Sequence, residues 1–472
     1  MAATAQLNAA NRLGTEPVGK LLFQFSVPAI TGMIVNALYN VVDRIWVGRG
    51  VNEIALGGLS LAMPLMTITM AFAMLFGVGA ANMISMRLGQ GRKEEAENAL
   101  NHCFFLLIIA GLLLMTLELI FLDPILARMG AEEGSAALEY ARNYYRIILY
   151  GQVFGMVSFG FSHCTRAQGF PTITMVSMFI GAGMNMILDP VFIIGFGWGV
   201  EGAAWATIIS QLAASIWILS FNFGKKAVIH LSLHTFKPAL VIIRDILAFG
   251  SSQFLLQFVM SAVQLLFNTS LGIYGPAELG PGGGVVALSG FNINMSIVML
   301  ILMPIFGINQ GAQPILGFNY GAKQYHRVRQ AFLLAIAGAT AICTTGFILA
   351  ELFPHFIVRL FAPNGSAALL DFAPRAMRII MIMLPLNGFT IVATNFFVVT
   401  GRPRTSIFLS MLRQFIALIP CIIIFGKLHG LWGVVAASPV ADGFAFICTG
   451  IMILMELKEL RLARSAGRSG ER

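Results

Sequence analysis

Two aspartates in this sequence lie inside stretches that otherwise read as lipid-soluble. Asp43 stands in NALYNVVDRIWVG, and Asp189 stands in MNMILDPVFIIGF. A charged side chain at the centre of a bilayer costs at least about 2.5–3.5 kcal/mol on insertion scales, and it persists mainly where it has a function or faces water. Both carboxylates are therefore candidate functional groups.

Side chains that carry oxygen accompany Asp189. Asn185 is four residues earlier, so in a helix it lies on the same face, one turn away. Pro190 removes a backbone donor and frees nearby carbonyl groups, which favours a bend in the helix. Thr207, in the next apolar stretch, supplies a hydroxyl group.

Asp43, Asn185, Asp189 and Thr207 together form an all-oxygen set. Such a set suits a hard monovalent cation such as Na⁺. It could hold a proton instead, because two carboxylates in a poorly solvated pocket resist ionising together. The residues leave both ions open.

Three further acidic residues in apolar stretches are as compatible with an interface position as with a function. They are Asp442, Glu118 and Glu351. Each can be placed close enough to a helix end for its carboxylate to reach the membrane interface.

The elements that would position these residues are membrane-spanning helices. The chain has 472 residues, of which 57% are hydrophobic and only 11% charged, and its mean hydropathy is +0.82. These values lie outside the range of soluble globular proteins. Stretches of roughly 20 apolar residues or more occur at about 22–48, 56–87, 98–122, 139–166, 171–195, 200–223, 246–273, 285–317, 326–353, 372–400, 404–426 and 431–455. We predict an all-α membrane protein with twelve transmembrane helices.

The distribution of Lys and Arg predicts the orientation of these helices. An even number of spans places both termini on one side, and the basic residues are more frequent where the segments would be cytoplasmic if the termini were. The net charge of +9 then reflects a basic inner face against anionic lipid. We therefore expect cytoplasmic termini and no binding of nucleic acid.

The sequence offers little support for enzyme chemistry. GTEPVGKL (14–21) fits part of a phosphate-binding loop, but Leu21 stands where Ser or Thr is required. The five cysteines form no CxxC pair, and the histidines are scattered. We expect a protein that is not an enzyme, does not use ATP and carries no cofactor.

The chain repeats itself at about half its length. RLGQGRKEEAENAL (87–100) has a counterpart in GFNYGAKQYHRVRQAF (317–332), and TRAQGFPTITMVSM (165–178) has one in VVTGRPRTSIFLSM (398–411). We predict two six-helix lobes related by pseudo-two-fold symmetry, the architecture of a secondary transporter. The predicted parts are an N-lobe at 1–222, a cytoplasmic linker at 223–245, a C-lobe at 246–456 with a loop insertion at 275–284, and a cytoplasmic tail at 457–472.

The repeat also provides an internal control for the polar set. Aligned through Pro171 and Pro403, the counterparts are Ala417 for Asn185 and Cys421 for Asp189, and Phe267 similarly stands opposite Asp43. If these polar residues served only the shared fold, the second lobe should have kept some of them. Their confinement to the first lobe favours a binding site.

Several motifs carry a resemblance to a known family. They are LGTEPVGKLLFQFSVPAI (13–30), VDRIWVG (42–48), RLGQG (87–91), RAQGFP (166–171), NMILDPVFIIGFGWGVEGAAWAT (185–207) and TGRPR (400–404). In this order and spacing the chain resembles the MATE (multidrug and toxic compound extrusion) transporters of bacterial type. That family belongs to a wider superfamily that includes flippases of lipid-linked oligosaccharides.

The resemblance implies an antiporter in the bacterial cytoplasmic membrane that exports organic cations or amphiphilic drugs in exchange for H⁺ or Na⁺ by alternating access. It maps the coupling-ion site onto Asp43, Asn185, Asp189 and Thr207. Because helices 7, 8 and 10 lack mid-span carboxylates, it leaves recognition of a cationic substrate to Asp43 and Asp189 with aromatic or methionine surfaces. We further expect a monomer, and a helix that bends near Pro28 when the ion binds.

Other functions remain open at this point. A flippase for lipid-linked saccharides would share the fold, but a pyrophosphate calls for a more strongly basic cavity than the arginines of the spans provide. These are Arg44 and Arg413, plus those near helix ends such as Arg142, Arg146, Arg375 and Arg378. An exporter of an endogenous metabolite would share the mechanism. A channel or scaffold would lack a coupled cycle, and ion-for-substrate exchange would exclude it.

Overall fold

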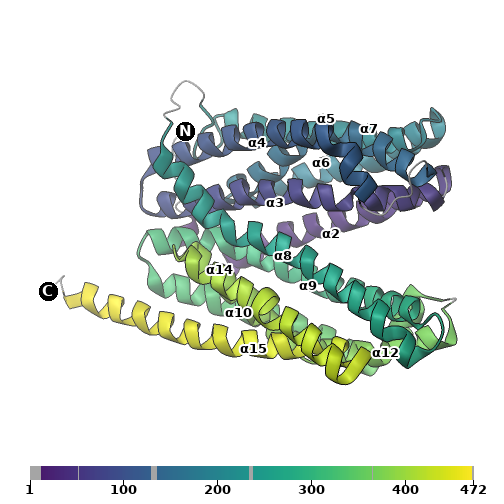
Figure 1. The fold of residues 1–472 in the computed structure, drawn as a ribbon. Coiled ribbons are helices and arrows are strands. Elements are labelled where there is room, and N and C mark those ends of the chain that lie inside the picture. The colour runs from purple at the N-terminus through teal and green to yellow at the C-terminus, as the bar shows by residue number, and fades with distance from the viewer. Residues whose placement is uncertain (1–11, 52, 129–134, 233–237, 364, 470–472) are drawn as a thin grey trace. The chain divides into compact units, whose positions relative to one another are not determined.

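The computed structural model describes residues 12–51, 53–128, 135–232, 238–363 and 365–469, and most of them are helical. The helices of the first half are α2 (Val18–Gly50), α3 (Glu53–Gly89), α4 (Lys93–Arg128), α5 (Ala136–Ala167), α6 (Pro171–Pro190), the π-helix η1 (Val191–Gly195) and α7 (Gly199–Phe223) (Figure 1). The second half holds α8 (Leu240–Leu279), α9 (Gly283–Gly321), α10 (Tyr325–Leu352), α11 (Pro354–Phe361), α12 (Ala367–Met381), α13 (Leu384–Val399), α14 (Pro403–Met411), the π-helix η2 (Leu412–Leu418) and α15 (Ile419–Ser469).

The described helices account for the twelve predicted spans. Ten stretches are long and apolar enough to cross a membrane, and α12 with α13, bent by 48°, forms an eleventh. One of the ten, Pro403–Glu456, is not a single helix, because its backbone leaves the helical region at Gly430 with φ 60° and ψ −137°. It is therefore two spans, and the expectation of an all-α, twelve-helix membrane protein is confirmed.

Contacts divide the chain into two compact units. Unit 1 comprises Met1–Gln257 and Gly317–Lys323, and unit 2 comprises Phe258–Leu316 and Gln324–Arg472. The first turns of α8 belong to unit 1 because Gly250 packs so tightly on the backbone of Leu75 in α3 that no Cβ would fit. The lobe bounds drawn from the sequence remain a prediction. The part of the predicted tail that the structure describes continues α15 as far as Ser469.

The expected loop at 275–284 is wrong in its first half. α8 continues to Leu279, and α9 begins at Gly283. Gly275 packs on the backbone of Gly283 at a distance that no side chain would allow, and Gly280 and Gly282 adopt positive φ values of 79° and 80°. The glycines thus build a tight helical hairpin instead of a long loop.

α5 is the central helix of unit 1 by its packing, because it contacts α3, α4, α6 and α7. In its most apolar window 61% of the residues are buried, compared with 22% in α4. A helix surrounded by other helices need not be soluble in lipid, and α5 accordingly carries many buried polar residues. This arrangement allows polar chemistry in the interior of the unit.

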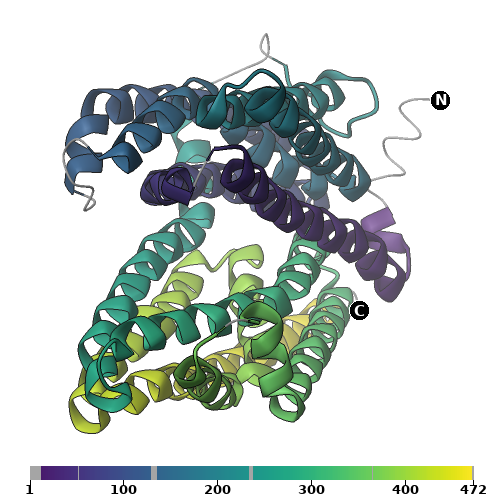
Figure 2. The same ribbon diagram turned by 90° about the vertical axis from the view of Figure 1, so that its right-hand side faces the viewer.

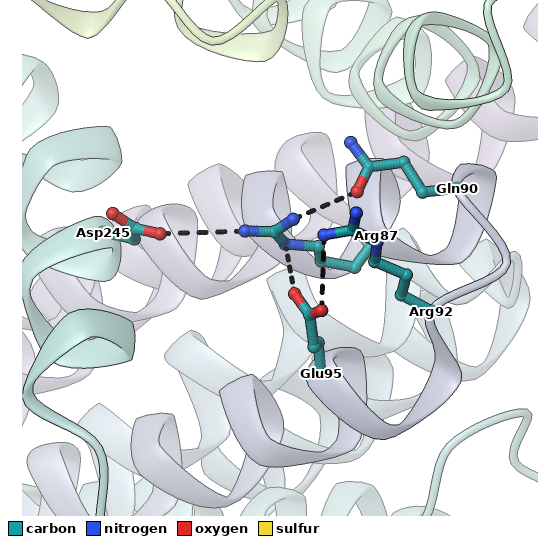
Figure 3. A network of polar contacts seen from close by, with 5 residues as sticks. All are labelled: Arg87, Gln90, Arg92, Glu95 and Asp245. Carbon is teal, nitrogen blue, oxygen red and sulfur yellow. Dashed lines mark hydrogen bonds and ion pairs between the residues drawn. The ribbon is translucent and has the colours of Figure 1, made fainter.

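The motif RLGQG ends α3 and turns the chain into α4. Arg87 contacts Glu95 at 3.0 Å and Asp245 of α8 at 3.9 Å, and it donates a hydrogen bond to Gln90 (Figure 3). Gly91 completes the turn with φ 74°. The motif is therefore explained by its structural role at the junction of three helices.

In unit 2, α13 packs against both α10 and α15, whose ribbons are green and yellow in Figure 2. The apolar core of unit 2 comes from α8, α9, α12, α15 and η2 and includes Phe267, Phe291 and Ala417.

The two π-helices, η1 and η2, have a wider backbone spiral than an α-helix, and such π-turns occur frequently at functional sites. One of them, η1, begins directly after Pro190.

Candidate ion-binding site

Unit 1 contains a cavity of about 450 Å³, lined mainly by α2, α3, α5, α6 and α7. Its wall is largely soft and aromatic: it includes Met63, Met66, Met70, Met156, Met178, Tyr39, Tyr144, Tyr145 and Phe159. Among the described lining residues, Asp43 is the charged one. Soft, adaptable side chains around a single acid can accommodate varied guests.

The predicted residues of α6 and α7 meet at this cavity. Asn185 and Thr207 line it, and Asp189 lies directly behind Asn185 with no exposed surface. The Asn185 amide donates a hydrogen bond of 3.1 Å to Asp189 Oδ1 and lies 3.4 Å from Thr207 Oγ1. The helical spacing therefore placed Asn185 and Asp189 correctly relative to each other.

Asp43 reaches the same place from α2. It lines the cavity, and its carboxyl group lies close enough to that of Asp189 to act on its charge. Glycines lie where α2 meets this segment: Gly32 packs against Met178 of α6, and Gly50 packs against Ile193 of η1. All four residues predicted from the sequence thus converge in one unit.

The arrangement is rich in oxygen acceptors. Oδ2 of Asp189 and Oδ1 of Asn185 are buried and receive no hydrogen bond from the described residues. Asp189 also has no Lys, Arg or His partner among them. Buried acceptors without donors are costly, so the site is suited to a cation or a shared proton.

Sequence reasoning missed Tyr144 of α5. Its side chain is 5% exposed, lines the cavity, and interacts with Thr207, Asp43 and Asp189. The only signal in the sequence is a tyrosine pair within an apolar stretch, which does not reveal the face that each ring occupies. Tyr144 adds a hydroxyl group to the oxygen set.

The other acidic residues lie apart from the four-residue set. Asp442 is 4% exposed, contacts Arg413 Nε at 2.6 Å and accepts a hydrogen bond of 3.0 Å from Asn387. Glu351 is exposed and pairs with Arg378. Of the two arginines predicted to lie in spans away from the helix ends, Arg413 is therefore paired, whereas the side chain of Arg44 lies outside the described residues.

The two proline positions differ. Pro190 ends α6, and the backbone continues as a π-helix closed by a hydrogen bond of 2.8 Å from Phe196 N to Val191 O. Pro28 lies within the continuous helix α2. Bending at Pro28 on ion binding remains a prediction.

Comparison with known proteins gives consistent results. Residues 28–191 and 253–423, one segment in each half, match the MatE family model. The multidrug export protein MepA of Staphylococcus aureus strain MRSA252 is 26% identical over 439 residues, which cover 93% of this chain and 94% of MepA. Among solved structures, a MATE protein in the bent conformation is 27% identical with a TM-score of 0.88, covering 98% of this chain and 99% of the other. An outward-facing multidrug resistance MATE transporter of the MOP superfamily is 29% identical with a TM-score of 0.87, covering 95% and 98%.

Proposed function

Because the chain belongs to the MatE family of transporters, we propose that it is a secondary antiporter that exports organic cations or amphiphilic drugs in exchange for H⁺ or Na⁺. The multidrug export attributed to its staphylococcal relative supports this substrate class. So does the cavity, whose methionine and tyrosine wall surrounds the carboxyl group of Asp43. Its volume of about 450 Å³ lies within the range of small-molecule sites.

The observation that carries the proposal is the pair of carboxyl groups of Asp43 and Asp189. They act on each other's charge inside a membrane protein, and Oδ2 of Asp189 has no donor among the described residues. A proton or Na⁺ from solution would supply the missing positive charge. Asn185, Thr207 and the Tyr144 hydroxyl would complete its oxygen ligands.

Coupling follows if ion and substrate compete for the same carboxyl groups. With the site open to the outside, the ion binds between Asp43 and Asp189, neutralises Asp43 on the cavity wall and weakens its attraction for a cationic substrate. Release of the ion on the inside restores that attraction. A tenfold antagonism between the two ligands corresponds to about 1.4 kcal/mol.

Movement of α2 relative to α6 is a physical route for this coupling, since Asp43 and Asp189 belong to these two helices. Neutralising the pair removes repulsion between them, and Pro28 offers a position where α2 can bend because a proline lacks the backbone donor. The protein would act as a monomer in the bacterial cytoplasmic membrane, with both termini inside. A fluorescent reporter fused to the C-terminus would glow only with that orientation.

The second candidate is a flippase of lipid-linked saccharides or an exporter of an endogenous metabolite. A pyrophosphate headgroup requires cationic side chains, but the described lining of the unit 1 cavity contributes Asp43 as its charged residue. Arg413, in unit 2, is already paired with Asp442. The observations therefore favour a cationic or amphiphilic substrate.

Transport into proteoliposomes tests the proposal. Inside-out protein is given a fluorescent organic cation under an imposed pH gradient and, separately, under a sodium gradient. We expect one gradient to drive uptake in the unchanged protein and neither to do so in Asp189→Asn. Glu351→Gln is the matched control, because that carboxylate is exposed and pairs with Arg378.

Two outcomes would contradict the proposal. Driven uptake by Asp189→Asn at the normal rate would remove the site from the coupling mechanism. If correctly folded, unchanged protein responds to neither gradient, organic cations are the wrong substrate, and flipping of a labelled lipid-linked saccharide becomes the assay.

A further inference from the structure

α5 carries two consecutive tyrosines that turn towards different acidic groups. Tyr144 interacts with Asp43, Asp189 and Thr207. The hydroxyl group of Tyr145 donates a hydrogen bond of 3.2 Å to Oε2 of Glu118 on α4. Consecutive helical residues point about 100° apart, so α5 separates two carboxyl sites at the same level along its axis.

Glu118 is directed into the unit rather than towards lipid. Its neighbours Leu117 and Ile120 are 43% and 64% exposed, whereas Glu118 is 5% exposed. Glu118 has no Lys, Arg or His partner among the described residues. A buried carboxyl group in a membrane span is costly to retain without a function.

The amide of Gln152 lies beside this carboxyl group. Gln152 is 5% exposed, lines the cavity and is near enough to act on the charge of Glu118. Oε1 of Glu118 and both polar atoms of the Gln152 side chain nevertheless make no hydrogen bond with the described residues. Glu118 and Gln152 are thus buried neighbours with polar atoms that make no close hydrogen bond within the described residues, and Gln152 brings two of these atoms to the cavity wall.

The two carboxyl sites of unit 1 have the same construction. Asp189 lies behind an amide on the cavity wall, Asn185, and near Tyr144; Glu118 lies behind the amide of Gln152 and against Tyr145. In each case an amide offers both a donor for the ionised carboxylate and an acceptor for the carboxylic acid. The set around Glu118 is thus able to stabilise either state of the group.

We propose that Glu118 is a proton-binding residue separate from the candidate ion site of Asp43 and Asp189, and that it exchanges H⁺ with water in the unit 1 cavity past Gln152 and Tyr145 during transport. The inference rests on ion-driven export as its setting. Uptake forms an O–H bond between a proton delivered by hydronium and the Glu118 carboxylate, leaving water. The new carboxylic acid donates to Gln152 Oε1, and Tyr145 retains its own proton throughout.

The geometry favours a proton over the other cations of the cycle. Glu118 does not itself line the cavity, whereas Tyr145 and Gln152 do, so an organic substrate in the cavity would meet these two side chains before the carboxyl group. A dehydrated metal ion needs several oxygen ligands, but the described groups beside the carboxyl are one phenol and one amide. A proton requires a single acceptor.

The titratable and charged groups around Glu118 are few. From α5, Tyr145 faces it, and from α3 the Thr69 hydroxyl contacts Tyr145. Arg142, one turn before Tyr145 on α5, is held by Asp123 at 2.6 Å. No described cation therefore competes with a proton for Glu118.

Infrared difference spectra of the purified protein between low and high pH test proton binding without requiring transport. We expect Glu118→Gln to remove one component of the carboxylic-acid C=O band, and, if the coupling ion is H⁺, Asp189→Asn to remove a different one. Asp123→Asn is the matched control on the same helix, because Asp123 is 66% exposed. A band unchanged in Glu118→Gln would overturn the inference, whatever the fate of ion-driven export.

Proteoliposomes measure the consequence for coupling. At zero membrane potential and a pH difference of one unit, each proton exchanged per substrate raises the attainable ratio of substrate concentrations across the membrane by about tenfold. We expect Glu118→Gln to lower the steady-state gradient of a fluorescent cation about tenfold, and Asp123→Asn to leave it unchanged. An unchanged plateau in Glu118→Gln would refute the inference, whereas loss of driven uptake in the unchanged protein would instead refute the proposed antiport.

A second variant covers the case in which Glu118→Gln fails to fold. Tyr145→Phe keeps the ring and the carboxyl group but removes the hydrogen bond to the ionised form. The Glu118 band component should then remain and appear at a higher pH. A titration midpoint identical to that of the unchanged protein would show that Glu118 does not exchange its proton at this position.

Discussion

In unit 2 the buried carboxylate of Asp442 is neutralised inside the protein, by Arg413 at 2.6 Å and by the amide of Asn387. In unit 1 the buried carboxylate of Asp189 has the amide of Asn185 but no cationic side chain among the described residues. In the repeat, η2 with Arg413 is the counterpart of part of α6, the helix of Asp189, whereas Asp442 lies on the counterpart of α7. Unit 2 therefore provides a counter-charge for its buried carboxylate, whereas the described part of unit 1 provides none for Asp189.

The positions of the unit 2 cluster make the comparison sharper. Glycines with positive φ at matching places, Gly169 with Gly401 and Gly199 with Gly430, align the repeats together with the two helix-starting prolines. This alignment gives Gly155 for Asn387, Gly181 for Arg413 and Gln211 for Asp442, and all three unit 1 counterparts line the cavity. Gly155 and Gln211 are also in contact, as Asn387 and Asp442 are.

The reverse comparison gives the same result. The counterparts of Asp43 and Asn185, Phe267 and Ala417, are buried in the apolar core of unit 2, and Cys421, opposite Asp189, packs against that core. Unit 2 thus has hydrophobic or paired groups at the positions where unit 1 has its cavity and the acidic residues beside it. Duplication accounts for the shared helices, and divergence at a few positions accounts for the candidate site.

The largest effect should come from exchanging counterparts. Asp189→Asn should lower ion-driven uptake about a hundredfold. The ion loses a charged ligand, and with it the difference in affinity between the two states of the transporter that coupling requires. Cys421→Ala, at the matching position of unit 2, should change it less than about twofold. Both are measured as initial rates of fluorescent-cation uptake in proteoliposomes, and equal losses in the two variants would remove the functional difference between the units.

Removing the internal counter-charge should affect stability rather than coupling. Arg413→Leu leaves the Asp442 carboxylate buried and unpaired, which should cost about 3 kcal/mol, since Arg413 is itself partly exposed. Adding Asp442→Leu should recover most of that loss, because an apolar pair of similar size avoids burying charge. Thermal unfolding in detergent measures both changes. If Arg413→Leu alone unfolds at the same temperature as the unchanged protein, neutralisation of Asp442 by Arg413 does not contribute to stability.

The sequence predicted the features that depend on local pattern. Twelve apolar stretches, the duplication and the joint position of Asn185 and Asp189 all follow from composition and helical spacing. The prediction that Asp43 lies near Asp189 came from the family resemblance and from the isolation of Asp43 in an apolar stretch, because no rule of helical spacing connects α2 with α6.

Other features depend on tertiary packing and could not be predicted. The sequence was as compatible with a membrane-interface position of Glu118 as with a functional one, because its burial depends on which face of α4 meets α5. Pairing of Arg413 with Asp442 joins η2 to α15, and Tyr144 reaches the site only because α5 is central. The π-helices also lack a reliable signal, apart from Pro190 before η1.

Ion binding should stabilise one unit selectively. A ligand at ten times its dissociation constant stabilises the folded protein by about 1.4 kcal/mol. If Na⁺ is the coupling ion, it should raise the unfolding temperature of the unchanged protein and of the Arg413→Leu, Asp442→Leu double variant, but not that of Asp189→Asn. Choline chloride at the same ionic strength is the control, and stabilisation that survives Asp189→Asn would place the ion elsewhere.

The smallest effect should come from Tyr144→Phe, which keeps the ring on the cavity wall and removes the hydroxyl group near Thr207. A neutral hydrogen bond contributes about 0.5–1.5 kcal/mol, so the affinity for the coupling ion should fall by roughly threefold to tenfold with uptake retained. The half-saturating ion concentration of driven uptake measures this change. A loss as large as that of Asp189→Asn would mean that Tyr144 carries the charge balance itself, whereas no change would reduce it to a packing residue and leave the carboxyl pair as the feature that separates unit 1 from unit 2.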